Sequence, residues 1–231
     1  MPDMYELFER EMPITVAVVT EPILQPPIAD IVELRADIYT QMQDPNALRE
    51  QCALLAGTAL MYTVRAEVEG GRFAGSEAKR AALFDTASEY VDILDVEIIS
   101  KAIRSKQMQQ ILDHDDRPIV IGSYHNLEGT PSFGQLRDLY NAGMALGVDY
   151  VKIATTVNTH DDWEELKHFT MKQSEEGGLI TVGMGAYGPL SRIVLPDLGS
   201  LLVYAPVGEH VVPGQIGLDE LNAIHAQILP Q

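Results

Sequence analysis

The chain has 231 residues, of which 46% are apolar and 22% charged, a composition that excludes a disordered or collagen-like protein and suits one globular domain. Against 16 Lys and Arg stand 34 Asp and Glu, and a formal net charge of −18 disfavours binding to nucleic acid or to anionic membranes. One cysteine, no apolar signal region in residues 1–13 and no uncharged stretch long enough to span a bilayer together predict a cytoplasmic protein.

Short apolar segments rich in β-branched residues recur along the chain and predict strands. They cover residues 13–19, 30–37, 58–65, 91–98, 117–125, 149–156, 179–185 and 200–206. Amphipathic patterns between most of them predict helices, for example at 76–90, 97–114, 133–147 and 161–173. Continuous apolar strands that alternate with helices are typical of parallel βαβ units, with the helices outside.

Eight such strands in a chain of this length favour a (β/α)8 TIM barrel, an α/β fold, over an open sheet. We expect a single catalytic domain over residues 1–231, in which 1–12 form an N-terminal extension. The first βα unit is shortened, because the segment 20–29 contains three prolines and has room for a turn of helix at most. We expect the N-terminal segment or a partner subunit to complete the barrel wall there.

Polar side chains stand where the predicted strands end, which in a barrel is the face that carries the active site. These residues are Glu33, Arg35, Arg65, Glu69, His125, Lys152, Arg192 and Gln215. Cations and acids that converge at the carboxyl ends of strands are the first indication of an enzyme.

Lys152 lies in the apolar segment Tyr150–Ala154, inside a predicted strand. If its side chain points into the barrel, burial disfavours the ammonium, and a neutral amine can attack a ketone to form a Schiff base. The alternative is a lysine that reaches solvent or pairs with an acid. Residue type and position leave both interpretations open.

His125 ends the strand that precedes the lysine strand, so the two side chains can reach one substrate. Histidine is the usual general acid and base near neutral pH, although a lone histidine can also simply close a strand by a hydrogen bond. The sequence has no HxH or HxxxH spacing, so we expect no metal site.

Six motifs in this order resemble the type I 3-dehydroquinate dehydratases, Schiff-base enzymes of the shikimate pathway. They are Glu33-Leu34-Arg35-Ala36-Asp37, Thr63-Val64-Arg65 with Glu69-Gly70-Gly71, Ser123-Tyr124-His125-Asn126 with Thr130-Pro131, Val151-Lys152-Ile153-Ala154, Met184-Gly185 through Ser191-Arg192, and Pro213-Gly214-Gln215. Each motif alone is weak, but the order and spacing match from about residue 13 to 225.

The resemblance implies a role for each site residue. Lys152 would form the imine with the C3 ketone of 3-dehydroquinate, His125 would move the protons, and Glu69 would hold His125. Arg192 and Gln215 would bind the C1 carboxylate. The ring hydroxyls would contact Glu33, Arg35 and Arg65. The product would be 3-dehydroshikimate, on the route to chorismate and the aromatic amino acids.

The resemblance further implies catalysis without metal or organic cofactor, a small anionic substrate as the binding partner and a homodimer. One departure is Val211, where the family usually has a serine in the flap over the substrate. The alternatives are a dehydratase paralogue that binds a related hydroxy acid without turnover, and another Schiff-base barrel lyase or aldolase.

Overall fold

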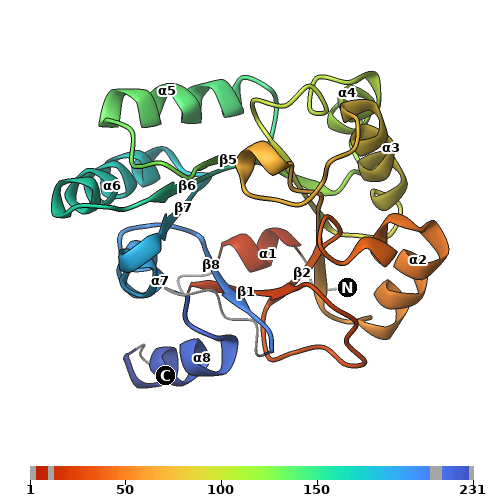
Figure 1. The fold of residues 1–231 in the computed structure, drawn as a ribbon, viewed down its shortest axis with the longest axis horizontal. Coiled ribbons are helices and arrows are strands. Elements are labelled where there is room, and N and C mark those ends of the chain that lie inside the picture. Colours follow the sequence, from red (N-terminus) through yellow and green to blue (C-terminus); the bar gives the residue numbers. More distant parts are fainter. Residues whose placement is uncertain (1–3, 10–12, 209–214, 229–231) are drawn as a thin grey trace.

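The computed structural model describes residues 4–9, 13–208 and 215–228, and these form one parallel eight-stranded sheet curled into a barrel (Figure 1). The strands are β1 (Ile14–Val19), β2 (Ile31–Arg35), β3 (Ala59–Thr63), β4 (Ile93–Glu97), β5 (Ile119–Asn126), β6 (Tyr150–Thr156), β7 (Leu179–Met184) and β8 (Leu202–Pro206). Each lies within or next to a predicted strand. The predicted TIM barrel is confirmed.

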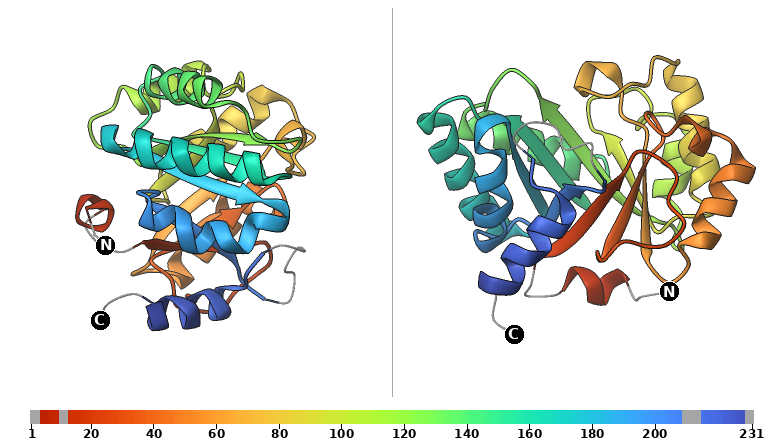
Figure 2. Two further views of the ribbon diagram at one scale, coloured as in Figure 1. Left: turned by 90° about the vertical axis from the view of Figure 1, so that its left-hand side faces the viewer. Right: turned by 60° about the horizontal axis from the view of Figure 1, so that its bottom comes forward.

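Helices surround the sheet on its outer face, as βαβ connections require (Figures 1 and 2). The α-helices are α1 (Met4–Phe8), α2 (Pro45–Leu54), α3 (Glu77–Ala87), α4 (Lys106–Leu112), α5 (Phe133–Met144), α6 (His160–Gln173), α7 (Gly188–Asp197) and α8 (Leu218–Ile228). Four short 3₁₀ turns accompany them among the described residues, η1 (Thr40–Gln43), η2 (Glu67–Glu69), η3 (Ser174–Glu176) and η4 (Gly185–Tyr187). None of the helices in the described ranges is long and apolar enough to cross a membrane.

Several helices begin where a short polar side chain caps the first turn. Asp44 accepts hydrogen bonds from two backbone amides of α2, and Ser76, Ser105 and Thr159 each accept one from α3, α4 and α6. Such caps satisfy amides that have no partner within the helix.

The prediction of a helix over 97–114 is wrong at its N-terminal half. Glu97 ends β4, and the helix begins only after the cap Ser105. The segment between them forms turns in which Ala102 and Ile103 are fully buried, so its apolar spacing reflects packing of a loop against the core.

Side chains along each strand alternate between the outer core and the barrel interior, as a period of two requires. Outward residues such as Leu34, Tyr62 and Val151 pack under the helices in one large cluster. Inward residues near the strand beginnings, such as Ile31 and Ile93, fill the lower barrel. Farther along the same strands the inward residues become charged, which leaves the functional site on an apolar floor.

The barrel is nearly closed, with β7 and β8 at the two ends of the hydrogen-bonded strand order. In the part of the chain that the structure describes, no ladder joins these strands. At the base of the seam the amide of Leu201 donates to the carbonyl of Leu179 at 3.1 Å, and the amide of Thr181 donates to Ser200 Oγ at 2.9 Å. The upper seam is closed by the side chain of Arg192, which contacts both strands.

The first βα unit is short, as predicted: no helix separates β1 from β2. The wall there is covered by α8, where Leu218 and Leu221 join the outer core and Asn222 Nδ2 donates to the carbonyl of Ile28 at 2.8 Å. The N-terminal α1 instead lies across the bottom of the barrel, with Leu7 and Phe8 in the inner cluster (Figure 2). The expectation that the N-terminal segment completes this wall is therefore wrong.

Candidate active site

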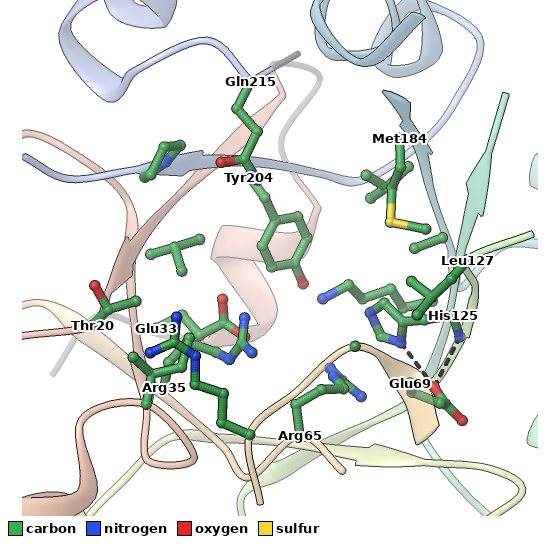
Figure 3. A pocket seen from close by; sticks show the side chains of 18 of the residues that line it. Thr20, Glu33, Arg35, Arg65, Glu69, His125, Leu127, Met184, Tyr204 and Gln215 are labelled. Carbon is green, nitrogen blue, oxygen red and sulfur yellow. Dashed lines mark hydrogen bonds and ion pairs between the residues drawn. The ribbon is translucent and has the colours of Figure 1, made fainter. Parts of the chain in front are cut away.

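A cavity of about 610 Å³ opens at the carboxyl ends of the strands (Figure 3). Every site residue predicted from the sequence lines it: Glu33, Arg35, Arg65, Glu69, His125, Lys152, Arg192 and Gln215. The structure thus brings together side chains from six strands and the loops that follow them, as the barrel predicts.

Lys152 points into the barrel from the middle of β6, with only 5% of its surface exposed. Its Nζ lies 3.0 Å from Asp95 Oδ2 and 3.8 Å from the centroid of the Tyr204 ring. Of the two interpretations that the sequence left open, the structure favours the inward one. The amine nevertheless pairs with an acid, and that acid is buried beside it.

His125 stands at the end of β5 and is held by Glu69. Both its Nδ1 and its backbone amide lie 2.9 Å from one carboxylate oxygen, Glu69 Oε2. The register places His125 beside Ala154 of β6, one inward position above Lys152. The predicted contact between Glu69 and His125 is present, and it is made by Nδ1 of the ring.

A tight turn after β3 delivers Glu69 to this position. Gly70 follows it with φ +82°, a left-handed conformation that favours glycine. The backbone then passes so close to the preceding strand end that a Cβ on Gly71 would lie 2.0 Å from the carbonyl oxygen of Arg65. Both glycines of the Glu69-Gly70-Gly71 motif therefore serve the geometry of the loop.

Burial sets the protonation of this pair. It raises the pKa of Glu69 to about 8, against the opposing charge of Arg65. Burial, together with the nearby positive charges of Arg65 and Lys152, holds the pKa of His125 well below 6.5. A neutral imidazole at neutral pH can accept a proton, which is what a general base requires.

Beneath the lysine lies an ion network that the sequence analysis missed. Asp95 accepts hydrogen bonds from Arg65 Nη2 and Ser123 Oγ, both at 2.6 Å, and its second oxygen faces Lys152. Arg65 also donates to Ser123 Oγ at 2.6 Å and lies 3.3 Å from Glu97. Burial alone would raise the pKa of Asp95, but Arg65 and Lys152 outweigh it and hold the carboxyl ionised.

One signal could have found this network. Asp95 and Glu97 are spaced by two in an otherwise apolar strand, which places both carboxylates on one face, and here that face is the barrel interior.

Arg192 closes the upper part of the β7–β8 seam. Its Nη1 donates to the carbonyl of Gly183 in β7 at 2.8 Å, and its Nε donates to that of Tyr204 in β8 at 3.2 Å. Within the described residues it has no acidic partner, and burial lowers its pKa to about 10. A buried charge without a counter-ion is costly, and Arg192 lines the cavity, from which an anion could reach it.

The remaining predicted residues lie around the cavity wall. Glu33 accepts a hydrogen bond from Thr63 Oγ1 at 2.6 Å, and Arg35 makes a bidentate pair with Asp37 at 2.8 Å. Gln215 lies at the rim (Figure 3). Val211 falls in 209–214, outside the described residues.

The chain was compared with known protein families, curated sequences and solved structures. A family model described as type I 3-dehydroquinase matches residues 21–229. The chain is 34% identical over 194 residues to the 3-dehydroquinate dehydratase of Thermodesulfovibrio yellowstonii, covering 84% of this chain and 83% of that protein. For the enzyme of the same name from Methanocaldococcus jannaschii, the identity is 32% over 200 residues, with coverage of 85% and 86%.

Among solved structures, the 3-dehydroquinate dehydratase from Aquifex aeolicus superposes with a TM-score of 0.79 at 26% identity, covering 94% of this chain and all of that one. The type I enzyme from Clostridium difficile superposes with a TM-score of 0.82 at 23% identity, covering 94% and 92%, and this likeness bears on the fold. Sequence, fold and family match agree over nearly the whole chain. The protein belongs to the type I 3-dehydroquinase family.

Proposed function

We propose that this protein eliminates water from 3-dehydroquinate, giving 3-dehydroshikimate, through an imine on Lys152. Family membership and the activity named for its curated relatives support a carbon–oxygen hydro-lyase of the shikimate pathway. The observation that carries the imine is a buried amine that lines the cavity one strand away from a neutral imidazole.

Imine formation starts from the Lys152–Asp95 pair. A lysine must lose a proton before its nitrogen can attack, and Nδ1 of His125 is occupied by Glu69, so we assign proton removal to Nε2 of His125. The nitrogen then bonds to C3 of the substrate, and the ketone oxygen leaves as water. Asp95 remains beside the nitrogen at 3.0 Å, where its negative charge stabilises the resulting iminium.

The iminium makes the neighbouring C2 proton acidic, because the electron pair left on C2 can spread to the nitrogen. His125 takes this proton and forms an enamine. The enamine then expels the C1 hydroxyl, and His125 returns the proton to the departing oxygen. Hydrolysis of the conjugated imine releases the product and restores Lys152.

We assign the orientation of the substrate to residues of the cavity wall. Arg192 is the buried cation of the cavity that has no acidic partner among the described residues, so we assign the C1 carboxylate to it, together with Gln215, which also lines the cavity. Glu33, Arg35 and Arg65 are assigned to the ring hydroxyls. The acidic pair partners of both arginines hold the guanidinium groups in fixed directions.

We expect the reaction to need neither metal nor organic cofactor, because each proton and bond change is assigned to a side chain, and activity should survive dialysis against EDTA. We further propose that the protein is cytoplasmic and forms a homodimer. Light scattering of the purified protein would check the dimer.

The proposal is tested by turnover and by chemical trapping. The product is a conjugated enone, so its formation can be followed by ultraviolet absorbance. Borohydride added during turnover should reduce the imine and attach the substrate skeleton to Lys152, as peptide mass spectrometry would show. An adduct on another lysine, or normal turnover without any adduct, contradicts the imine mechanism.

Two lysine variants sharpen the test. Lys152→Met should abolish turnover and trapping, since it keeps the length of the side chain without the nitrogen. Lys172→Met is the matched control, because Lys172 lies on the surface of α6 and is half exposed. Binding of dehydroquinate without turnover in the unmodified protein would favour the paralogue, and turnover of a different hydroxy-ketone acid the lyase alternative.

A further inference from the structure

The Tyr204 hydroxyl is a buried polar group without a hydrogen-bond partner among the described residues. Tyr204 projects from β8 into the middle of the cavity (Figure 3), and the side chain is 7% exposed. A buried hydroxyl that makes no hydrogen bond costs folding free energy, which a phenylalanine in the same place would not.

A second buried tyrosine shows how the fold treats a hydroxyl that serves structure alone. Tyr62 of β3 points outward into the helix layer, and its hydroxyl donates to the carbonyl of Met42 at 3.0 Å. The two residues share their chemistry and differ in whether the protein itself supplies a partner. At Tyr204 the partner has to come from elsewhere.

The surroundings of the hydroxyl identify what kind of partner fits. Burial and the negative charges of Asp95 and Glu33 hold the pKa of Tyr204 well above 10. The group therefore keeps its proton and acts as a hydrogen-bond donor, so the missing partner is an acceptor. The ring itself lies against Lys152, whose Nζ is 3.8 Å from the ring centroid.

We propose that Tyr204 is a further catalytic residue, whose hydroxyl donates a hydrogen bond to the substrate's ketone oxygen while Lys152 displaces that oxygen. The ketone carbon must come within bonding distance of Nζ, so its oxygen is brought to the side chain that lies against Nζ. The acceptor is present only when substrate is bound, which explains why the hydroxyl has no partner among the described residues. This inference rests on the proposed imine chemistry.

The bond changes define where the donor acts. The lysine nitrogen bonds to the carbonyl carbon, the C=O π pair moves to oxygen, and the oxygen takes up a proton to give the carbinolamine. The nitrogen lone pair then forms C=N⁺ as the C–O bond breaks, and the oxygen leaves as water with a second proton. Both protons originate from the lysine ammonium, so Tyr204 stabilises the oxygen and ends with its own proton.

The test is Tyr204→Phe, which keeps the ring against Lys152 and removes only the hydroxyl. In rapid-quench trapping with borohydride, the rate of adduct formation should fall about 10²-fold, the usual effect of losing one donor to a developing oxyanion. At the same time Tm should rise by up to about 4 °C, because an unpaired hydroxyl has been removed. A structural role would not combine slower chemistry with a more stable protein.

Tyr62→Phe is the matched control: it should lower Tm and leave the rate of adduct formation unchanged. An unchanged adduct rate in Tyr204→Phe overturns the inference, whether or not KM changes, since the hydroxyl then does not act on the ketone oxygen. If the unmodified protein neither turns over dehydroquinate nor forms an adduct, the proposed function itself is wrong. That result is distinguishable from a wrong assignment of Tyr204, in which the unmodified protein is active and the variant forms the adduct at the same rate.

Discussion

Burial keeps both members of the His125–Glu69 pair uncharged at neutral pH. The pKa of Glu69 is raised to about 8 by burial, whereas that of His125 lies well below 6.5. The backbone amide of His125 holds Glu69 Oε2 in place, and rotation of the ring would break the contact of Nδ1 with the same oxygen. The pair thus offers an oriented, neutral imidazole, beside a carboxyl that loses its proton only as pH rises through about 8.

His125→Ala should reduce kcat by about 10²–10⁴-fold, the usual contribution of one proton-transfer group, and more if His125 serves several steps. Borohydride should still attach substrate to Lys152, more slowly, because the amine remains in place. Steady-state kinetics and mass spectrometry of the trapped protein measure the two effects. Near-native turnover in this variant would assign the proton transfers to another group.

The sequence allowed Lys152 and His125 to be placed because each stands at or near the end of a predicted strand, where a barrel concentrates its chemistry. Asp95 was missed because an acid inside an apolar strand is ordinarily assigned to solvent. Only the closed barrel shows that this face of β4 is interior. The lone hydroxyl of Tyr204 likewise becomes visible only when its neighbours are known.

At the scale of elements, one side chain joins the two strands in the upper part of the β7–β8 seam. Arg192 reaches carbonyls on both strands, and it also donates to the carbonyl of Gly188 at 2.8 Å, at the start of its own helix α7. A planar guanidinium can make these contacts together because its donors point in several fixed directions. The side chain that joins the two strands therefore also lines the cavity, where we propose that it binds the substrate.

Arg192→Lys should consequently lose stability as well as affinity. Lysine keeps the charge but cannot reach all three carbonyls, and we expect a loss of about 2–4 kcal/mol in the free energy of unfolding, together with a raised KM. Urea denaturation and steady-state kinetics measure the two quantities. A raised KM at unchanged stability would show that the seam is held by other contacts.

Element boundaries could be predicted where a cap or a strand end marks them. The prediction failed where a loop packed against the core has the apolar spacing of a helix. The helix expected over 97–114 begins after Ser105, since a serine that caps an amide overrides the apolar spacing before it. The order of strands and the shortened first unit followed from the pattern alone. The packing of α8 over that unit could not be predicted from the pattern, because this contact joins segments that are far apart in the sequence.

At the scale of the whole molecule, the raised pKa of Glu69 ties stability to pH. Between pH 4.5 and about 8 the folded protein retains a proton that an unfolded glutamate, with a pKa of 4.5, has lost. The stabilisation that this proton gives is therefore fully present below pH 4.5 and is lost as pH rises through about 8. Below 6.5 the unfolded His125 takes up a proton that the folded imidazole does not, which offsets the change. The net loss of stability therefore falls between pH 6.5 and 8.

Urea denaturation across this range should show the free energy of unfolding falling as pH rises, by at most about 1.4 kcal/mol per pH unit from this one group. In Glu69→Gln the free energy of unfolding should depend less on pH, because an amide does not titrate. The comparison removes contributions from other groups, which are common to both proteins. Parallel curves for the two proteins would contradict the assigned protonation of Glu69.

The helix α1 packs against the bottom of the barrel. Phe8 stacks on Tyr150 with ring centroids 4.3 Å apart, and Tyr150 opens the strand that carries Lys152 two residues later. A version of the protein that begins at residue 13 would uncover apolar ends of several strands, among them Ile14 and Ile31. Because an exposed apolar surface favours aggregation, we expect the shortened protein to stay in solution less well than the full chain.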